Sequence, residues 1–171
     1  MKTVVAVFFA VLFFSTSFAQ NKNFVTVDSS SKEPMLLGYC SREAFKDTSF
    51  SWWFNSEYLF YKVDSVSAEK IKNDMNNVKV TIVMGSWCSD SRRWVPDFFK
   101  IMDFIHYPSD SVNIICVDRD LHGRNNETDS LNVKKVPTFI FYRNNKELGR
   151  IIEEPKVSLE KDMIAILKKG N

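Results

Sequence analysis

The alternation of buried-strand patterns with an amphipathic helix pattern constrains the fold of this chain most strongly. Residues 78–84 and 112–117 are mostly apolar and rich in β-branched side chains, as in strands covered on both faces. Residues 91–106, between them, carry apolar side chains at three-to-four spacing, which predicts a helix containing Pro96. Two buried strands joined through a helix favour parallel pairing.

The C-terminal part of the chain adds a predicted hairpin. Residues 138–142 and 147–152 both have strand character. Asn144-Asn145 lies between them, and asparagine tolerates the positive φ angles of a tight hairpin turn. We therefore expect an antiparallel pair beside the parallel strands.

Three further helices complete the prediction. They cover residues 67–75 with Ser67 as N-cap, residues 128–134, and residues 159–168 with Ser158 as N-cap. The expected fold is an α/β sandwich of three layers, a mixed central sheet with helices on both faces.

The first 65 residues divide into a leader and an extension. Residues 1–19 are predicted to be a signal peptide, and residues 20–65 a lead-in followed by an aromatic-rich extension of the main domain, residues 66–171. Residues 21–33 are polar and indicate a flexible segment. Residues 34–64 favour short helices packed on the main domain, with a strand at residues 58–63 as the alternative.

The leader has the three parts of a secretory signal. Lys2 is followed by an apolar run over residues 4–14, and Ser17-Phe18-Ala19 fits a small-x-small cleavage pattern. The apolar run is too short to span a membrane, for which about 20 residues are needed. The sequence thus predicts an exported protein, periplasmic or secreted, without a stable membrane span after cleavage.

Charge and ligand-type residues exclude several functions. The chain has 23 basic and 21 acidic residues with no basic run, which argues against nucleic acid as a partner. His106 and His122 have no metal-ligand spacing, and no glycine-rich phosphate loop is present. We expect no metal and no cofactor.

Three cysteines, Cys40, Cys88 and Cys116, are present in this exported chain. In an oxidising compartment disulfides persist, and an odd number leaves at least one thiol without an intramolecular partner. Cys116 lies within an apolar run and is interpreted as a small buried side chain. Cys40 is either an unreactive or paired cysteine, or a thiol that reaches the reactive site.

Cys88 occupies the position where a reactive cysteine is expected. It follows the strand at residues 78–84 and precedes the predicted helix at residues 91–106. This junction lies at the C-terminal edge of a sheet, and the positive end of the helix dipole favours thiolate over thiol. Arg92 and Arg93 add positive charge nearby, and Asp90 opposes it.

At these residues the chain resembles the thioredoxin superfamily. Trp87-Cys88-Ser89-Asp90-Ser91 is similar to the family motif Trp-Cys-x-x-Cys, and Val136-Pro137-Thr138 resembles the family's cis-proline loop. Pro96 matches the helix proline of the family. The resemblance covers approximately residues 67–169 and implies a thioredoxin-like fold in which a cis Pro137 faces Cys88, as in exported bacterial members of the family.

Three departures from the family pattern alter the implied mechanism. Ser91 replaces the second cysteine, Ile82 stands where thioredoxins keep a buried acid, and Asn145 replaces a turn glycine. Ser91 can hydrogen-bond a thiolate but cannot complete a second disulfide. The site is therefore predicted to use one thiol.

The resulting hypothesis is a monothiol thiol–disulfide oxidoreductase or isomerase acting on exported proteins or small thiols through a mixed disulfide. Cys88 is the nucleophile, Pro137 the platform for substrate backbone and Ser91 a hydrogen-bond partner. The residues predicted to flank the site are Trp87, Ser89, Asp90, Arg92 and Val136. The alternatives are a redox-inactive binding module and, less favoured, a thiol peroxidase. Cys40 is the candidate resolving thiol.

Overall fold

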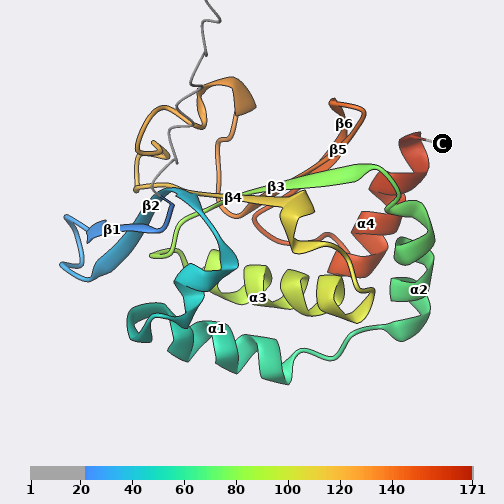
Figure 1. Cartoon of the computed structure of the whole chain (residues 1–171), viewed down its shortest axis with the longest axis horizontal. Coiled ribbons are helices and arrows are strands. Elements are labelled where there is room, and N and C mark those ends of the chain that lie inside the picture. The colour runs from blue at the N-terminus through green and yellow to red at the C-terminus, as the bar shows by residue number, and fades with distance from the viewer. Residues whose placement is uncertain (1–21, 171) are drawn as a thin grey trace, which may run out of the picture.

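A six-stranded mixed sheet forms the centre of the protein, which is described here from a computed structural model covering residues 22–170. The predicted signal peptide lies outside the described residues. The strand order is β1-β2-β4-β3-β5-β6 (Figure 1). The strands are β1 (Phe24–Val27), β2 (Pro34–Cys40), β3 (Val78–Met84), β4 (Val112–Cys116), β5 (Thr138–Arg143) and β6 (Lys146–Ile152).

Four α-helices and four short 3-10 helices accompany the sheet in the described part of the chain. The α-helices are α1 (Thr48–Phe60), α2 (Ser65–Asp74), α3 (Ser89–Phe104) and α4 (Leu159–Leu167). The 3-10 helices are η1 (Arg42–Lys46), η2 (Ser109–Ser111), η3 (Asp129–Leu131) and η4 (Lys168–Gly170).

The central strand pairing agrees with the prediction from the sequence. β3 and β4 are parallel and joined through α3, whereas β5 and β6 pair antiparallel beside β3. Asn144 and Asn145 have φ angles of 51° and 62°, so the hairpin turn uses the left-handed conformation that asparagine tolerates. The predicted mixed α/β fold is confirmed.

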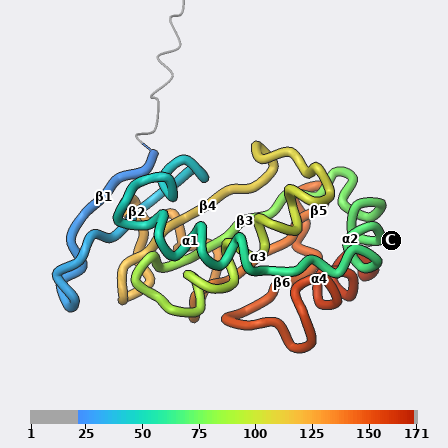
Figure 2. Tube along the Cα trace, turned by 90° about the horizontal axis from the view of Figure 1, so that it is seen from below, coloured from blue at the N-terminus to red at the C-terminus, as the bar shows by residue number. Residues whose placement is uncertain are grey.

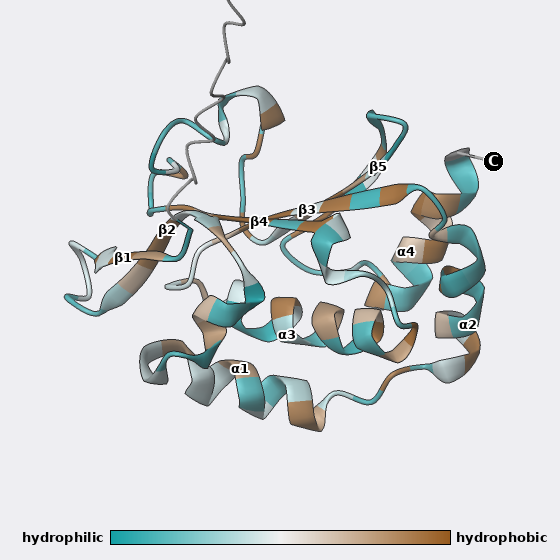
Figure 3. Cartoon of the chain, in the orientation of Figure 1, coloured by the Kyte–Doolittle hydropathy of each residue, from teal (hydrophilic) through white to brown (hydrophobic). Residues whose placement is uncertain are grey.

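The two faces of the sheet are covered differently. Figures 1 and 2 show the four α-helices on one side, with α3 between α1 and the sheet. The other face is covered by the segment over residues 117–137, in which η3 replaces the longer helix predicted at residues 128–134. The central strands consist largely of apolar residues, drawn in brown in Figure 3, as expected for a sheet covered on both faces.

The N-terminal region is more ordered than the sequence suggested. Residues 21–33, expected to be flexible, contain β1, and residues 34–40, expected to be helical, form β2. Both strands extend the sheet because β2 pairs antiparallel with β4. Residues 58–63, the alternative strand, instead contain the end of α1 and a connection to α2.

The helix caps show one further difference from the prediction and one agreement with it. α2 begins at Ser65, and the N-cap is Asp64, whose side chain accepts a hydrogen bond from the backbone N–H of Ser67. The prediction of Ser67 as the cap was therefore wrong by one helical turn. Ser158 caps α4 as predicted, accepting a hydrogen bond from the backbone N–H of Lys161.

Across residues 22–170, none of the helices combines the length and apolar character required to cross a membrane.

Candidate functional site

Cys88 lies at the junction between β3 and α3, where it is the N-cap residue of the helix. Its backbone N–H donates to the carbonyl of Gly85 at 2.9 Å, and its carbonyl accepts from the N–H of Arg92 at 3.0 Å. These bonds close the turn that leads from the sheet into the helix. The half-buried side chain therefore sits next to the positive end of the α3 dipole.

The Val136–Pro137 loop faces Cys88. The Cys88 thiol donates to the carbonyl oxygen of Val136 at 3.4 Å, and the Val136–Pro137 peptide bond is cis. Thr138 fixes the loop from its C-terminal side, because its hydroxyl donates to the carbonyl of Lys135 at 2.6 Å. The structure thus brings together two parts of the predicted site that lie 48 residues apart.

Ser91 is fully buried, and its hydroxyl forms a hydrogen bond within the turn between β3 and α3. The Ser91 oxygen accepts a hydrogen bond from the backbone N–H of Gly85 at 3.2 Å. No hydrogen bond between Ser91 and the Cys88 thiol is present within residues 22–170. Ser89 and Asp90 are exposed on the first turn of α3.

Trp87 forms one wall of the site. Its indole N–H donates to the carbonyl of Val117 at 2.9 Å, which ties the site to the loop after β4. The ring packs so closely on Gly85 that a Cβ there would lie 2.6 Å from ring atom Cε2. Glycine is therefore required at residue 85 by this contact.

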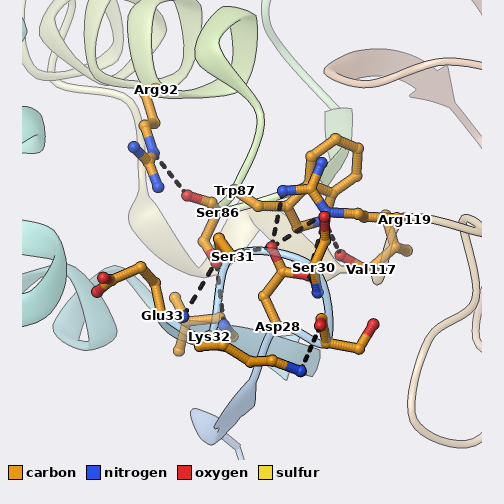
Figure 4. A network of polar contacts seen from close by, with 12 residues as sticks. Asp28, Ser30, Ser31, Lys32, Glu33, Ser86, Trp87, Arg92, Val117 and Arg119 are labelled. Carbon is orange, nitrogen blue, oxygen red and sulfur yellow. Dashed lines mark hydrogen bonds and ion pairs between the residues drawn. The ribbon is translucent and has the colours of Figure 1, made fainter.

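An ion pair between the exposed Arg119 and the buried Asp28 lies beside the Trp87 ring (Figure 4). Asp28, only 2% exposed, accepts hydrogen bonds from Nε and Nη2 of Arg119, the shorter at 2.7 Å. The Arg119 guanidinium lies 4.8 Å from the centre of the Trp87 ring, within cation–π range. Asp28 also accepts from the Ser30 N–H and the Ser31 hydroxyl in the β1–β2 turn.

Asp28 and Arg119 shift each other's pKa. The hydrogen bonds from Arg119, followed by that from Ser31, hold the pKa of Asp28 well below its usual range. The partnership with Asp28 raises the pKa of Arg119, and a smaller contribution comes from the negative charge of a Cys88 thiolate. Arg119 therefore carries a positive charge that interacts with Asp28 and, more weakly, with Cys88.

Asp28 and Arg119 were not predicted from the sequence. Asp28 lies in the segment interpreted as a flexible lead-in, and Arg119 is 91 residues away from it. The local signal was Asp28-Ser29-Ser30-Ser31, because aspartate followed by serine favours a turn closed by the carboxylate. That signal predicts a turn, but it does not identify a partner across the sheet.

Ser86 and Arg92 attach the N-terminal region to the site. The buried Ser86 hydroxyl accepts from the backbone N–H of Leu36 in β2 at 3.0 Å. The Ser86 carbonyl accepts from Nε of Arg92 at 2.7 Å, and the guanidinium lies 5.7 Å from the ring centre of Trp52 in α1. Arg92 therefore holds α1, α3 and the turn together.

The structure does not bring Cys40 to Cys88. Cys40 belongs to the apolar cluster between the sheet and the helices, together with Cys116. Cys88 borders the cluster on the opposite face of the sheet. Ile82, which stands where thioredoxins keep an acid, is fully buried between its strand neighbours Ile114 and Phe139.

Two hollows on the surface lie away from Cys88. One, of about 620 Å³, is lined by residues including Lys72, His106 and Tyr142, and another, of about 450 Å³, by residues including Tyr39 and Arg42. Cys88 is not among the described residues that line either hollow. Over the described range, no three His, Cys, Asp or Glu residues are grouped in a way that would hold a metal ion.

Comparisons with known proteins agree with this description of the fold. No family model matches the chain. A thioredoxin-like protein, R548 of Acanthamoeba polyphaga mimivirus, is 25% identical over 79 residues, which are 46% of this chain. The match spans 55% of that relative's length.

Solved structures give a similar result. A Pseudomonas aeruginosa protein of unknown function, PA1234, superposes with a TM-score of 0.58 at 11% identity, covering 77% of this chain and 93% of that one. Fasciola hepatica thioredoxin has a TM-score of 0.40 at 19% identity, covering 60% and 89%. The chain is a mixed α/β protein that is similar over 46% of its length to a thioredoxin-like protein, and it carries Cys88 at the junction of β3 and α3.

Proposed function

We propose that this protein is an exported thiol–disulfide oxidoreductase or isomerase in which Cys88 is the single attacking thiol. The observation that carries the proposal is the position of the Cys88 thiol, half-exposed at the N-terminus of α3 and 3.4 Å from the Val136 carbonyl beside cis Pro137. A cysteine at a helix N-terminus next to a cation has the surroundings in which thiolates form and react.

The reaction is an exchange of sulfur partners. The Cys88 thiolate attacks one sulfur of a substrate disulfide, a new S–S bond forms to that sulfur, and the other substrate sulfur leaves as a thiolate. Attack by the departing thiolate or by another thiol on the substrate sulfur of the mixed disulfide then releases Cys88. Net isomerisation consumes no oxidant, because every bond broken is replaced by one formed.

The neighbouring residues have separate roles in this proposal. The Val136–Pro137 loop positions substrate backbone against Cys88, and Arg119 stabilises the thiolate through its charge. Ser91 acts by holding the turn through Gly85, so it positions the thiol rather than contacting it. Because serine at residue 91 cannot attack a disulfide, the mixed disulfide is expected to persist until an external thiol arrives.

Trapping of the mixed disulfide tests the proposal. Incubation of the purified protein with a disulfide-containing peptide is expected to give an adduct on Cys88, which a small thiol releases. Cys88→Ser should abolish the adduct, and Ser89→Ala, at the exposed neighbouring residue, should retain it. Equal adduct formation by Cys88→Ser and the wild-type protein would show that Cys88 is not the attacking group.

A binding module remains the second candidate, favoured by the absence of a second cysteine from the site. In that case the protein should retain partners equally well with Cys88→Ser, without any covalent adduct. Export is tested separately by fractionation and N-terminal sequencing, which should find Gln20 as the first residue of the mature protein. Retention of residues 1–19 in the mature protein would contradict it.

A further inference from the structure

Cys40 and Cys116 lie on neighbouring strands and on the same face of the sheet. In the antiparallel pairing of β2 with β4, Cys40 is opposite Ile114 and Gly38 is opposite Cys116. The two cysteines are therefore diagonal neighbours, since residues two apart on a strand share a face. Both belong to the apolar cluster on the helix side, with exposed fractions of 5% and 0%.

The Cys40 thiol is directed along β2 towards Gly38, the residue paired with Cys116. Its Sγ donates to the carbonyl oxygen of Gly38 at 3.6 Å, so the side chain leans back along β2 towards the residue opposite Cys116. Both cysteines are free thiols in the structure, and the interaction with Cys40, followed by burial, raises the pKa of Cys116.

We infer that Cys40 and Cys116 are a disulfide site, and that their oxidation links β2 to β4 and leaves Cys88 as the one free thiol. This inference does not depend on the proposed function of Cys88. It accounts for the odd number of cysteines in the chain, because one pair and one reactive thiol use all three. It also removes Cys40 from the resolving role considered for it above.

The oxidation requires a disulfide-bearing oxidant, such as the oxidised form of a small thiol. One cysteine thiolate attacks the oxidant and displaces one small-molecule thiolate, which gives a mixed disulfide. The second cysteine thiolate then attacks the protein sulfur and displaces the other small-molecule thiolate. The two protein thiols lose two protons and two electrons, and the oxidant is reduced to two thiols.

Burial determines when this reaction takes place. In the folded protein both sulfurs lie beneath the helices, so an external oxidant reaches them while the chain folds and before the helices cover the sheet. The bond then constrains the unfolded chain, because it closes the long loop that contains β3 and α3. The role of this pair is therefore structural, whereas that of the half-buried Cys88 at the candidate site is chemical.

Peptide mapping provides a direct test, because trypsin places each cysteine in a separate peptide, at residues 33–42, 80–92 and 101–119. The full chain is refolded with reduced and oxidised glutathione and alkylated in denaturant, so that burial cannot protect a thiol. We expect the first and third peptides to be recovered as a linked pair, with Cys88 alkylated or glutathionylated. Recovery of Cys40 and Cys116 mainly as alkylated thiols, or of a link to Cys88, would overturn the inference.

Thermal unfolding gives a second readout. Addition of a reductant that opens the bond should lower the melting temperature of the oxidised wild-type protein and of Cys88→Ser by several degrees. The double variant Cys40→Ala/Cys116→Ala should not respond to the reductant. If the double variant does not fold, the test is peptide mapping of Cys88→Ser. In that variant the Cys40–Cys116 disulfide is the only intramolecular disulfide that can form. Absence of the linked peptide from Cys88→Ser would refute the inference.

Discussion

At the scale of single residues, Arg119 is expected to affect the rate at which Cys88 reacts with iodoacetamide. Arg119→Ala removes the positive charge that acts on Cys88 and leaves Asp28 without its ion-pair partner. We expect iodoacetamide to label Cys88 about threefold more slowly at pH 6.5 and low salt, because an exposed charge contributes less than about 1 kcal/mol. High salt should reduce the difference between the variant and the wild-type protein.

Arg124→Ala is the matched control for this experiment. Arg124 lies in the same loop region, but its guanidinium stacks over Phe24, 4.0 Å from the ring centre. The labelling rate of Cys88 should therefore stay at the wild-type value. Equal slowing by both substitutions would indicate a general loosening of the loop, and the proposed charge effect of Arg119 would be withdrawn.

The position of Cys88 between a strand and a helix, facing the Val136–Pro137 loop, was predictable because its signals are local. The strand before Cys88, the helix after it and the Val136-Pro137-Thr138 sequence each occupy a few consecutive residues. The Asp28–Arg119 pair joins residues 91 positions apart, and neither residue has a sequence pattern that identifies the other. The placement of Cys40 diagonally to Cys116 likewise depends on the register of β2 against β4, which the sequence did not reveal.

At the scale of elements, α1 contributes stability through a buried aromatic contact with α3. The Phe54 ring lies 4.8 Å from that of Phe45 and 6.1 Å from that of Phe99, measured between ring centres. Phe54→Ala should lower the free energy of unfolding by about 3 kcal/mol or more, the usual cost of removing a buried aromatic ring. Urea denaturation measures this difference.

Leu59→Ala on the same helix is the control for Phe54→Ala. Leu59 is 72% exposed, and its truncation should change the free energy of unfolding by less than about 0.5 kcal/mol. Similar losses for the two variants would mean that α1 does not pack through Phe54. A small loss for Phe54→Ala alone would contradict the role of the aromatic contact.

The same helix shows why the N-terminal region was poorly predicted. Its buried residues Trp53 and Phe54 are adjacent to the exposed Trp52, and exposed Leu59 and Phe60 follow. Apolar side chains on both faces obscure the 3.6-residue period that identifies an amphipathic helix. α3, by contrast, has a polar outer side beside its apolar face and was predicted to within two residues at each end.

At the scale of the whole molecule, Asp97 is expected to control stability near neutral pH. It is 4% exposed in α3, and its Oδ1 has no hydrogen-bond partner among the described residues. Burial is the largest cause that raises its pKa to about 7, followed by the charge of Glu57; Arg93 opposes the shift and Glu160 adds to it. The folded protein thus holds the Asp97 proton more tightly than the unfolded chain does.

The direction of the pH dependence follows from linkage. A carboxyl whose pKa is raised on folding stabilises the fold fully below its unfolded value, 3.8, and this contribution is lost as the pH rises towards about 7. Carboxyls whose pKa is lowered act in the opposite direction, and their contribution is lost in acid. This second group includes Asp28, Asp47, Asp64, Asp103 and Glu147.

Asp97→Asn tests this balance, because an amide keeps the shape of the side chain without a charge to bury. At pH 8 the variant should be more stable than the wild-type protein by about 2 kcal/mol, and the difference should diminish towards pH 5, where wild-type Asp97 is protonated. Urea unfolding at several pH values measures both curves, with Asp110→Asn in the exposed η2 as a control that should follow the wild-type curve. If the difference in the free energy of unfolding between Asp97→Asn and the wild-type protein is the same at every pH from 5 to 8, the ionisation of Asp97 does not cause the change in stability over this range.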